Sequence, residues 1–240
     1  MSIKSKIRNL ALACGIEMHW YNAAHSPTAR LFTALAQHNV KNIIDVGANT
    51  GGYGHALRAG GYCGNILSFE PLCDAHQKLQ EAAAKDSNWH IASRMALGAE
   101  DGVIDINVSE NSVSSSILNI HETHVNAAEH SRFINVQKTP IKRLDQVDLS
   151  CFRNDSPLFL KIDTQGYEMP VLQGTEGLFK RIVGLQIELS LVPLYENQLL
   201  YEEIIGWLNE RGYEMWNIIP GFSDSKNGRM LQMDGIFFRR

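Results

Sequence analysis

Residues 42–52 read N-I-I-D-V-G-A-N-T-G-G, and this stretch decides the fold of the chain. Its first five residues are mostly apolar and β-branched, and they stop at Gly47, as a buried parallel strand stops at a tight turn. Gly47 and Gly51 lack a Cβ atom, so the backbone can bend sharply and approach a ligand closely. The helix that follows offers unpaired N–H groups in its first turn. Strand, loop and helix together predict a cofactor-binding loop.

The polar residues of this loop indicate which cofactor it suits. Asn49 stands where the dinucleotide fingerprint G-x-G-x-x-G has its second glycine, and the sequence contains no G-x-x-x-x-G-K-[ST] phosphate-binding loop. Asp45 lies two residues before the first glycine, where its carboxylate suits a cationic ligand better than an anionic pyrophosphate. We therefore expect S-adenosylmethionine, with Asp45, Gly47, Asn49 and Gly51 among the binding residues.

A second motif, S-F-E-P, ends the next apolar run at Glu70. Glu70 follows the glycines by about 20 residues, the distance at which an acidic residue accepts hydrogen bonds from ribose hydroxyls. The alternative is that Glu70 only caps the helix that starts near Pro71. We expect it to bind the cofactor.

Four motifs together resemble those of FkbM-type methyltransferases, and the resemblance covers about residues 40–240. They are D-V-G-A-N-T-G, S-F-E-P, M-A-L-G at residues 95–98, and K-I-D-T-Q-G-Y-E-M-P-V-L-Q-G at residues 161–174. Where this family usually has V-E-G, the chain has Thr164, Gln165 and Gly166. The resemblance implies a class I fold and methylation of hydroxyl oxygens, often of sugars or secondary metabolites. It also implies that Ala96 and Leu97 lie beside the adenine.

Apolar runs and helical patterns alternate after residue 42, which predicts an α/β, Rossmann-like, seven-stranded, mostly parallel sheet with helices on both faces and an antiparallel C-terminal strand. The expected strands are 42–46, 64–69, 88–92, 157–162, 182–188, 213–217 and 234–239. The expected helices are 52–60, 72–84, 167–179 and 198–211. The ligand of such a sheet lies outside the carboxyl ends of its strands.

We expect two parts: residues 1–40 as a helical extension packed on the core, and residues 41–240 as the methyltransferase domain. The extension shows helical patterns at about 3–14 and 27–38. Within the domain, residues 99–140 indicate an insertion over the site, with alternating residues 103–108 as a half-exposed strand.

The inserted stretch supplies candidate acceptor-binding residues, for which we select Ser115, Ser116 and His121. His121, His124 and His130 also invite a metal interpretation, but they lack paired Cys or carboxylate partners at ligand spacing, so solvated histidines are the simpler explanation. Trp216, near the end of the chain, is a further candidate for a substrate wall, although core packing is the default for such a residue.

The chemistry is expected at L-F-L-K-I-D and L-Q-I-E-L-S. Lys161 and Asp163 lie two apart on one side of a strand, and Asp163 ends it. Glu188 ends the neighbouring strand. The two carboxylates would either hold Mg²⁺ or act without metal as base and hydrogen-bond acceptor. We favour the metal-free version, with Asp163 as base and Lys161 and Glu188 in support, because only two oxygen ligands are evident.

The composition and net charge of the chain restrict its possible partners. The chain has 240 residues, 44% hydrophobic and 20% charged, with net charge −4 and pI near 6.1. These values fit one globular domain and give no electrostatic case for nucleic acid. Four scattered cysteines without C-x-x-C spacing indicate reduced thiols, and an apolar N-terminal run broken by Arg8 and Asn9 argues against a signal peptide, so we expect a cytoplasmic protein. No apolar run is long enough for a membrane span.

The sequence thus predicts an S-adenosylmethionine-dependent O-methyltransferase acting on a sugar, glycan or secondary-metabolite hydroxyl. A non-catalytic cofactor-binding module is the first alternative, because Gln165 departs from the family pattern. An NAD-dependent oxidoreductase is the second, disfavoured by Asp45 and Asn49. The oligomeric state stays open.

Overall fold

A computed structural model describes residues 3–110, 114–128, 131–152 and 156–240. Its main sheet has seven strands in the order β3-β2-β1-β7-β8-β10-β9. Pairing is parallel from β3 to β8, and β10 is antiparallel to both β8 and β9. The strands are β1 (Asn42–Val46), β2 (Asn65–Phe69), β3 (Trp89–Ile91), β7 (Leu158–Ile162), β8 (Ile182–Ser190), β9 (Tyr213–Pro220) and β10 (Gln232–Arg239). The predicted α/β fold is confirmed.

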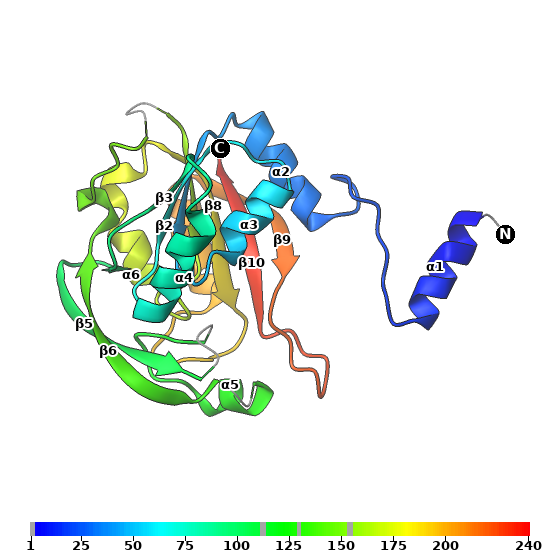
Figure 1. The fold of residues 1–240 in the computed structure, drawn as a ribbon. Coiled ribbons are helices and arrows are strands. Elements are labelled where there is room, and N and C mark those ends of the chain that lie inside the picture. Colours follow the sequence, from blue (N-terminus) through cyan, green and yellow to red (C-terminus); the bar gives the residue numbers. More distant parts are fainter. Residues whose placement is uncertain (1–2, 111–113, 129–130, 153–155) are drawn as a thin grey trace.

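Helices cover both faces of the sheet (Figure 1). On one face, α2 (Pro27–Gln37), α3 (Gly52–Ala59) and α4 (Cys73–Ala83) pack through leucines against Ile43 of β1. On the other face, α6 (Glu168–Gln173) and α7 (Tyr201–Glu210) pack against the opposite side of the same strand. Both sides of β1 are therefore buried, which explains its nearly continuous apolar sequence.

The predicted helix 167–179 is wrong in its second half. Helix α6 ends at Gln173, and a short 3-10 turn, Glu176–Leu178, follows. At the break, a Cβ atom on Gly174 would lie 1.9 Å from the carbonyl oxygen of Gly98. The chain leaves the helix where its backbone meets that of Gly98, a contact that no local sequence pattern predicts.

The insertion contains a second sheet, in the order β4-β6-β5. The strands are β4 (Ala96–Leu97), β5 (Gly102–Ser109) and β6 (Phe133–Lys142), and α5 (Glu122–Ala127) lies between β5 and β6 in the sequence. The predicted strand 103–108 is confirmed, whereas β6, which contains Pro140, was not predicted. Pro140 fits because β4 pairs only with residues 141 and 142, which leaves the backbone before them on an open edge. Figure 1 shows β5 and β6 curving together away from the main sheet.

The two N-terminal helices behave differently. Helix α2 is capped by Ser26, whose hydroxyl accepts from the N–H of Ala29, and it buries Leu31 and Leu35 on the core. Helix α1 (Ile3–Ala13) stands away from the domain (Figure 1). The expected packing of the extension on the core therefore describes α2, while α1 lacks buried residues among its described side chains. Among the described helices, none has the length and apolar character of a membrane span.

Candidate active site

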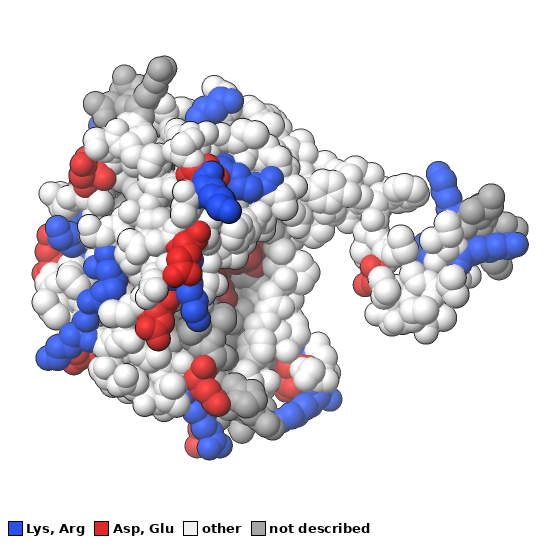
Figure 2. All heavy atoms as spheres, viewed as in Figure 1, with Lys and Arg blue, Asp and Glu red and all other residues white. Residues whose placement is uncertain are grey.

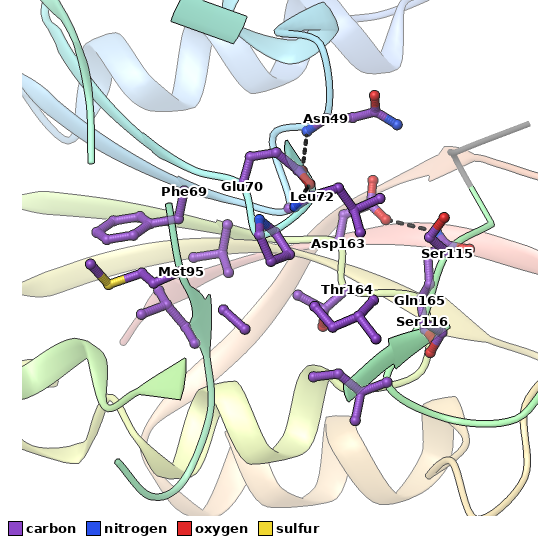
Figure 3. A pocket seen from close by; sticks show the side chains of 17 residues that line it. Asn49, Phe69, Glu70, Leu72, Met95, Ser115, Ser116, Asp163, Thr164 and Gln165 are labelled. Carbon is purple, nitrogen blue, oxygen red and sulfur yellow. Dashed lines mark hydrogen bonds between the residues drawn. The ribbon is translucent and has the colours of Figure 1, made fainter. Parts of the chain in front are cut away.

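A cavity of about 100 Å³ opens at the carboxyl ends of β1, β2 and β7 (Figure 3). After β1 the chain continues to β2 on one side of it, whereas β7 lies on its other side, so the cavity sits at the switch in strand order. Its lining residues are Val46, Gly47, Asn49, Phe69, Glu70, Pro71, Leu72, Met95, Ala96, Leu97, Ile106, Ser115, Ser116, Ile117, Asp163, Thr164 and Gln165.

The glycine-rich loop forms one wall of the cavity. Gly47 has φ 77°, and a Cβ atom there would lie 1.9 Å from the carbonyl oxygen of Asp163. The loops after β1 and β7 therefore meet at a distance that only glycine permits. Asn49 also has positive φ, at 47°, and lines the cavity. Gly51, which we expected to contact the cofactor, instead caps α3 and packs against Trp89.

Glu70 fastens the loop to the next strand. Its carboxylate accepts from the backbone N–H of Asn49 at 2.8 Å and from that of Leu72 at 2.9 Å (Figure 3). Burial raises the pKa of Glu70 to about 7, although these two bonds oppose the rise. Two N–H donors leave further acceptor capacity on the carboxylate, and Glu70 lines the cavity. Glu70 thus both organises the turn before α4 and keeps oxygen lone pairs for a ligand.

The opposite end of the cavity is apolar. Ala96 and Leu97 of β4 line it with Phe69 and Met95, and Ile106 reaches it from β5. These surfaces suit the flat face of a nucleoside base. Ser115 and Ser116, from the loop after β5, line the cavity near Asp163, so the insertion and the main sheet share this site (Figure 3).

Asp45 lies beneath the cavity rather than in its wall. Its side chain is fully buried, with Lys161 Nζ 3.2 Å from one carboxylate oxygen and the Ser68 hydroxyl donating to the other. Lys161 also lies 3.4 Å from Asp163 and donates to the carbonyl of Gly47. Burial alone lowers the pKa of Lys161, but the charges of Asp45 and Asp163 outweigh it and raise the pKa. Lys161 is a fixed cation that ties the glycine loop to β7.

Gln165 joins the two carboxylates that we expected to carry the chemistry. Its Nε2 donates to Asp163 at 2.8 Å and to Glu188 at 2.9 Å, while its Oε1 accepts from the hydroxyl of Tyr195 at 2.8 Å. Its backbone has φ 55°, and its carbonyl accepts from the Ser116 hydroxyl. Both ends of the side-chain amide and the backbone carbonyl of Gln165 are therefore engaged in holding the site.

The acids of the site differ in burial and in the charges around them. Burial raises the pKa of Glu188 well above its ordinary value, and the charges of Asp163, Glu168 and Asp234 raise it further. Burial also raises the pKa of Asp234 to about 6. Asp163, by contrast, is 34% exposed and lies beside the cation of Lys161. Glu188 is thus the acid whose surroundings favour its protonated form, and Asp163 is the one with a cation beside it.

A divalent cation does not fit between Asp163 and Glu188 as they are arranged. The amide hydrogens of Gln165 point at an oxygen of each carboxylate, where a metal ion would have to coordinate. Across the described ranges 3–110, 114–128, 131–152 and 156–240, no three His, Cys, Asp or Glu side chains are grouped as ligands for a metal.

Two expected substrate-binding residues lie away from the cavity. His121 is exposed at the start of α5, where its ring accepts from the N–H of Thr123. Trp216 of β9 stacks edge-on against His38 and contacts Phe238. Of the other histidines that we considered, His124 is buried beside Tyr195, and His130 lies outside the described residues.

Several residues of the site were missed from the sequence. Tyr195, which holds Gln165, lies in the loop after β8 and has no local motif. Lys161 Nζ lies 5.4 Å from the centre of the Tyr53 ring. The Tyr53 hydroxyl donates to Gln186, which in turn donates to Asp234, so these polar side chains form a row across the sheet. The available signal was Gln186, a polar residue between the apolar Leu185 and Ile187 of β8. Thr164 follows directly after Asp163, so strand-end position alone could have identified it.

The fold and the pocket define a domain of the class I methyltransferase type, with a seven-stranded sheet, an antiparallel β10 and a cavity at the switch point. Residues 45–215 match the family model described as the methyltransferase FkbM domain, and the chain belongs to this methyltransferase family. No curated protein matches the sequence.

Solved structures resemble this chain in fold. A putative RNA methyltransferase from Pyrococcus horikoshii is 11% identical, with 89% of this chain and 83% of that chain covered and a TM-score of 0.45. TehB from Haemophilus influenzae is 11% identical, with 88% and 62% covered and a TM-score of 0.48. Magnesium protoporphyrin IX methyltransferase from Synechocystis PCC 6803, solved with bound SAM, is 10% identical, with 100% and 98% covered and a TM-score of 0.47.

Proposed function

We propose that this protein is an S-adenosylmethionine-dependent O-methyltransferase that acts on a hydroxyl of a sugar, glycan or secondary metabolite. One observation carries the proposal: in a chain of the FkbM methyltransferase family, the ends of β1, β2 and β7 deliver Gly47, Glu70 and Asp163 to a single cavity. Membership of a methyltransferase family gives no support to the oxidoreductase alternative.

The residues present fit the cofactor. The free lone pairs of Glu70 suit ribose hydroxyls, the apolar end at Ala96 and Leu97 suits adenine, and Asp163 lies where the methyl group of the cofactor is expected. Gly47 leaves the backbone open to close approach. When bound, S-adenosylmethionine supplies an electrophilic methyl group. Asp45 has an indirect role here, because it fixes Lys161 and, through that side chain, the carbonyl of Gly47.

Asp163 is the proposed general base. Its carboxylate is partly exposed to the cavity and accepts the proton that an acceptor hydroxyl gives up. Gln165 fixes the orientation of this carboxylate, and Lys161 stabilises its charge. Glu188 keeps its own proton, so it does not add a second negative charge beside the base. General-base assistance of this kind contributes roughly a hundredfold to ten-thousandfold in rate.

We infer that the reaction proceeds without a divalent cation, because Gln165 donates into the space where the cation would bind. Full activity after EDTA treatment would agree with this inference. A loss of activity that Mg²⁺ restores would overturn it.

The acceptor is expected to enter beside Ser115 and Ser116, which carry hydroxyl groups from the insertion to the cavity. Hydroxyls and carboxylates are suitable partners for a polyhydroxylated molecule. All four cysteines are free thiols, which agrees with the reducing cytoplasm that we propose as the compartment.

Calorimetric titration with S-adenosylmethionine and S-adenosylhomocysteine tests the cofactor site. We expect binding to weaken by about tenfold or more in Glu70→Gln, since a hydrogen bond to a charged group is worth about 1.5–3 kcal/mol. Glu81→Gln, at an exposed position on α4, is the matched control and should bind as the unaltered protein does. Equal affinities for both variants would refute the role of Glu70.

Methyl transfer from labelled cofactor to a panel of glycans and hydroxylated metabolites tests the chemistry. Asp163→Asn should lower turnover about a hundredfold to ten-thousandfold and leave cofactor affinity nearly unchanged. Loss of cofactor binding instead would show that Asp163 is a binding residue. Tight cofactor binding without transfer to any acceptor would favour the non-catalytic module.

A further inference from the structure

The segment that includes α1 and residues 14–25 exposes an unusual amount of apolar surface. In α1, Ile7 is 52% exposed and Leu10 is 68% exposed. Beyond it, Met18, Trp20 and Tyr21 are each more than half exposed. These side chains lie far from the active-site cavity, and Figure 1 shows that α1 stands clear of the domain. A water-soluble surface does not ordinarily gather large apolar side chains in this way, so the segment needs a partner.

The apolar residues of α1 form a stripe bordered by cations. Ile7, Leu10 and Ala11 are spaced three and four apart and share one face of the helix. At 100° per residue, Lys4 and Lys6 fall on either side of this stripe. Their flexible stems can lie along apolar surface while the ammonium groups reach outward. This is the pattern of a helix that lies in a plane between an apolar and a charged phase.

The segment that follows α1 folds back on it. Lys4 Nζ lies 5.0 Å above the ring of Trp20, which brings an aromatic side chain beside the basic edge of the helix. Met18 and His19 line the same hollow as Lys4, Ile7 and Arg8. Trp and Tyr side chains prefer the boundary between hydrocarbon and water, because their rings are apolar and their N–H or O–H groups are polar.

Residues 3–25, which we call the N-terminal arm, carry a net positive charge, whereas the whole chain is negatively charged. Helix α1 contains Lys4, Lys6 and Arg8 and no acidic residue, whereas the chain carries a net charge of −4. Figure 2 shows blue Lys and Arg atoms gathered on the arm, with little red beside them. A complementary partner must therefore present negative charge at its surface and apolar material just beneath.

We propose that α1, with Trp20 and Tyr21, docks on the surface of an anionic lipid membrane and lies in its headgroup region. Such a surface offers both complements at once: acidic headgroups for the three cations, and acyl chains for Ile7 and Leu10. A second copy of this chain would satisfy the charge through its acidic body, but it would also have to supply an apolar face for the stripe. Residues 14–25 would then connect the docked helix to the domain.

Co-sedimentation of the full chain with vesicles tests the proposal. We expect binding to phosphatidylcholine vesicles that contain 30% phosphatidylserine and much weaker binding to pure phosphatidylcholine. The triple variant K4Q/K6Q/R8Q should bind the anionic vesicles about a hundredfold more weakly, from roughly fivefold per cation. The variant K78Q/K85Q/K138Q makes the same charge change at exposed positions of the domain and should bind as the unaltered protein does.

The apolar stripe is tested separately. I7S/L10S should also lose binding to anionic vesicles, while V103S/I134S, which alters two exposed apolar residues of the domain, should not. Tryptophan emission should shift to shorter wavelength with anionic vesicles and lose this shift in Trp20→Phe. None of the described side chains of α1 is buried in the core. K4Q/K6Q/R8Q and I7S/L10S should therefore keep the thermal midpoint of the unaltered protein.

Three outcomes would overturn the proposal. The first is that the full chain does not bind anionic vesicles at low ionic strength. The second is that K4Q/K6Q/R8Q and K78Q/K85Q/K138Q bind equally well. The third is a concentration-dependent dimer in sedimentation equilibrium that I7S/L10S abolishes, without vesicle binding, which would assign the stripe to a second copy of the chain.

Discussion

Gln165 lies between two carboxyl groups, so Gln165→Glu is a sharp test of how the site is held. The substitution replaces an N–H₂ group that donates to Asp163 at 2.8 Å and to Glu188 at 2.9 Å by a third acid. Shape and size change little, whereas the hydrogen bond donated to the Asp163 carboxylate becomes a repulsive contact and the bond donated to Glu188 is lost. We expect the folded protein to lose stability as the introduced carboxyl group ionises.

The distance between Gln165 and Asp163 sets the size of the expected loss of stability. Two unit charges 2.8 Å apart repel by about 6 kcal/mol at an effective dielectric constant of about 20. The introduced group would rather keep a proton, which costs about 1 kcal/mol at pH 5 and about 5 kcal/mol at pH 8 from an ordinary pKa near 4.3. Because Asp163 is 34% exposed, water screens part of this repulsion. We therefore expect the variant to lose, at pH 8, roughly half of the cost of about 5 kcal/mol given above.

Proton linkage gives the direction in which the stability of Gln165→Glu changes with pH. The introduced carboxyl group has a raised pKa in the folded state, so the folded state binds more protons than the unfolded state between the two pKa values. The stability of the variant relative to Gln165→Met, a neutral control of similar size, should therefore fall as pH rises from 5 to 8. Urea denaturation of both variants at pH 5 and pH 8 measures this difference. A gap that does not widen with pH would refute the proposed arrangement.

Three further predictions concern other parts of the same framework. Gly47→Ala should lower stability and abolish cofactor binding, because its Cβ atom would lie 1.9 Å from the Asp163 carbonyl oxygen, whereas Gly52→Ala, with nothing within 4 Å, should be neutral in thermal unfolding and in titration. Burial raises the pKa of Glu168 to about 7, so the stability that this group contributes is present below pH 4.5 and is lost as pH rises through 7. Glu168→Gln should therefore reduce the decline in unfolding free energy between pH 5 and pH 8 by about 3 kcal/mol. An unchanged decline would contradict this prediction. Tyr195→Phe removes the donor to Oε1 of Gln165 and should cost about 1–3 kcal/mol in urea denaturation. Tyr201→Phe removes a hydroxyl that donates to Glu202 at an exposed position and should cost far less, so equal losses would count against the role of Tyr195.

The sequence determined the layers of the fold and the edge of the sheet that carries the site. Strand and helix periods are local, so the apolar run at β1 and the helices around it could be predicted within a few residues. Gly47 and Glu70 could be selected because a turn after a strand and an acid after the next strand are also local features. Their arrival at one cavity follows from parallel pairing, which brings strand ends to the same edge.

The tertiary structure alone decided which way the acids face. Asp45 was expected at the cofactor, but register pairs it with Lys161 of β7, a residue far away in the sequence, and the buried cation holds it beneath the cavity. A lone buried carboxylate would be costly, so the nearest cation determines its orientation.

The roles of Gln165 and Tyr195 were likewise invisible in the sequence. Gln165 looked like a departure from a family motif, and Tyr195 belonged to no motif, yet the two side chains meet to position Asp163 and Glu188. Local patterns fix which residues form strands and turns, because those preferences depend on a few neighbours along the chain. Contacts between loops depend on register and packing across the whole sheet, and these become defined only when the chain has folded.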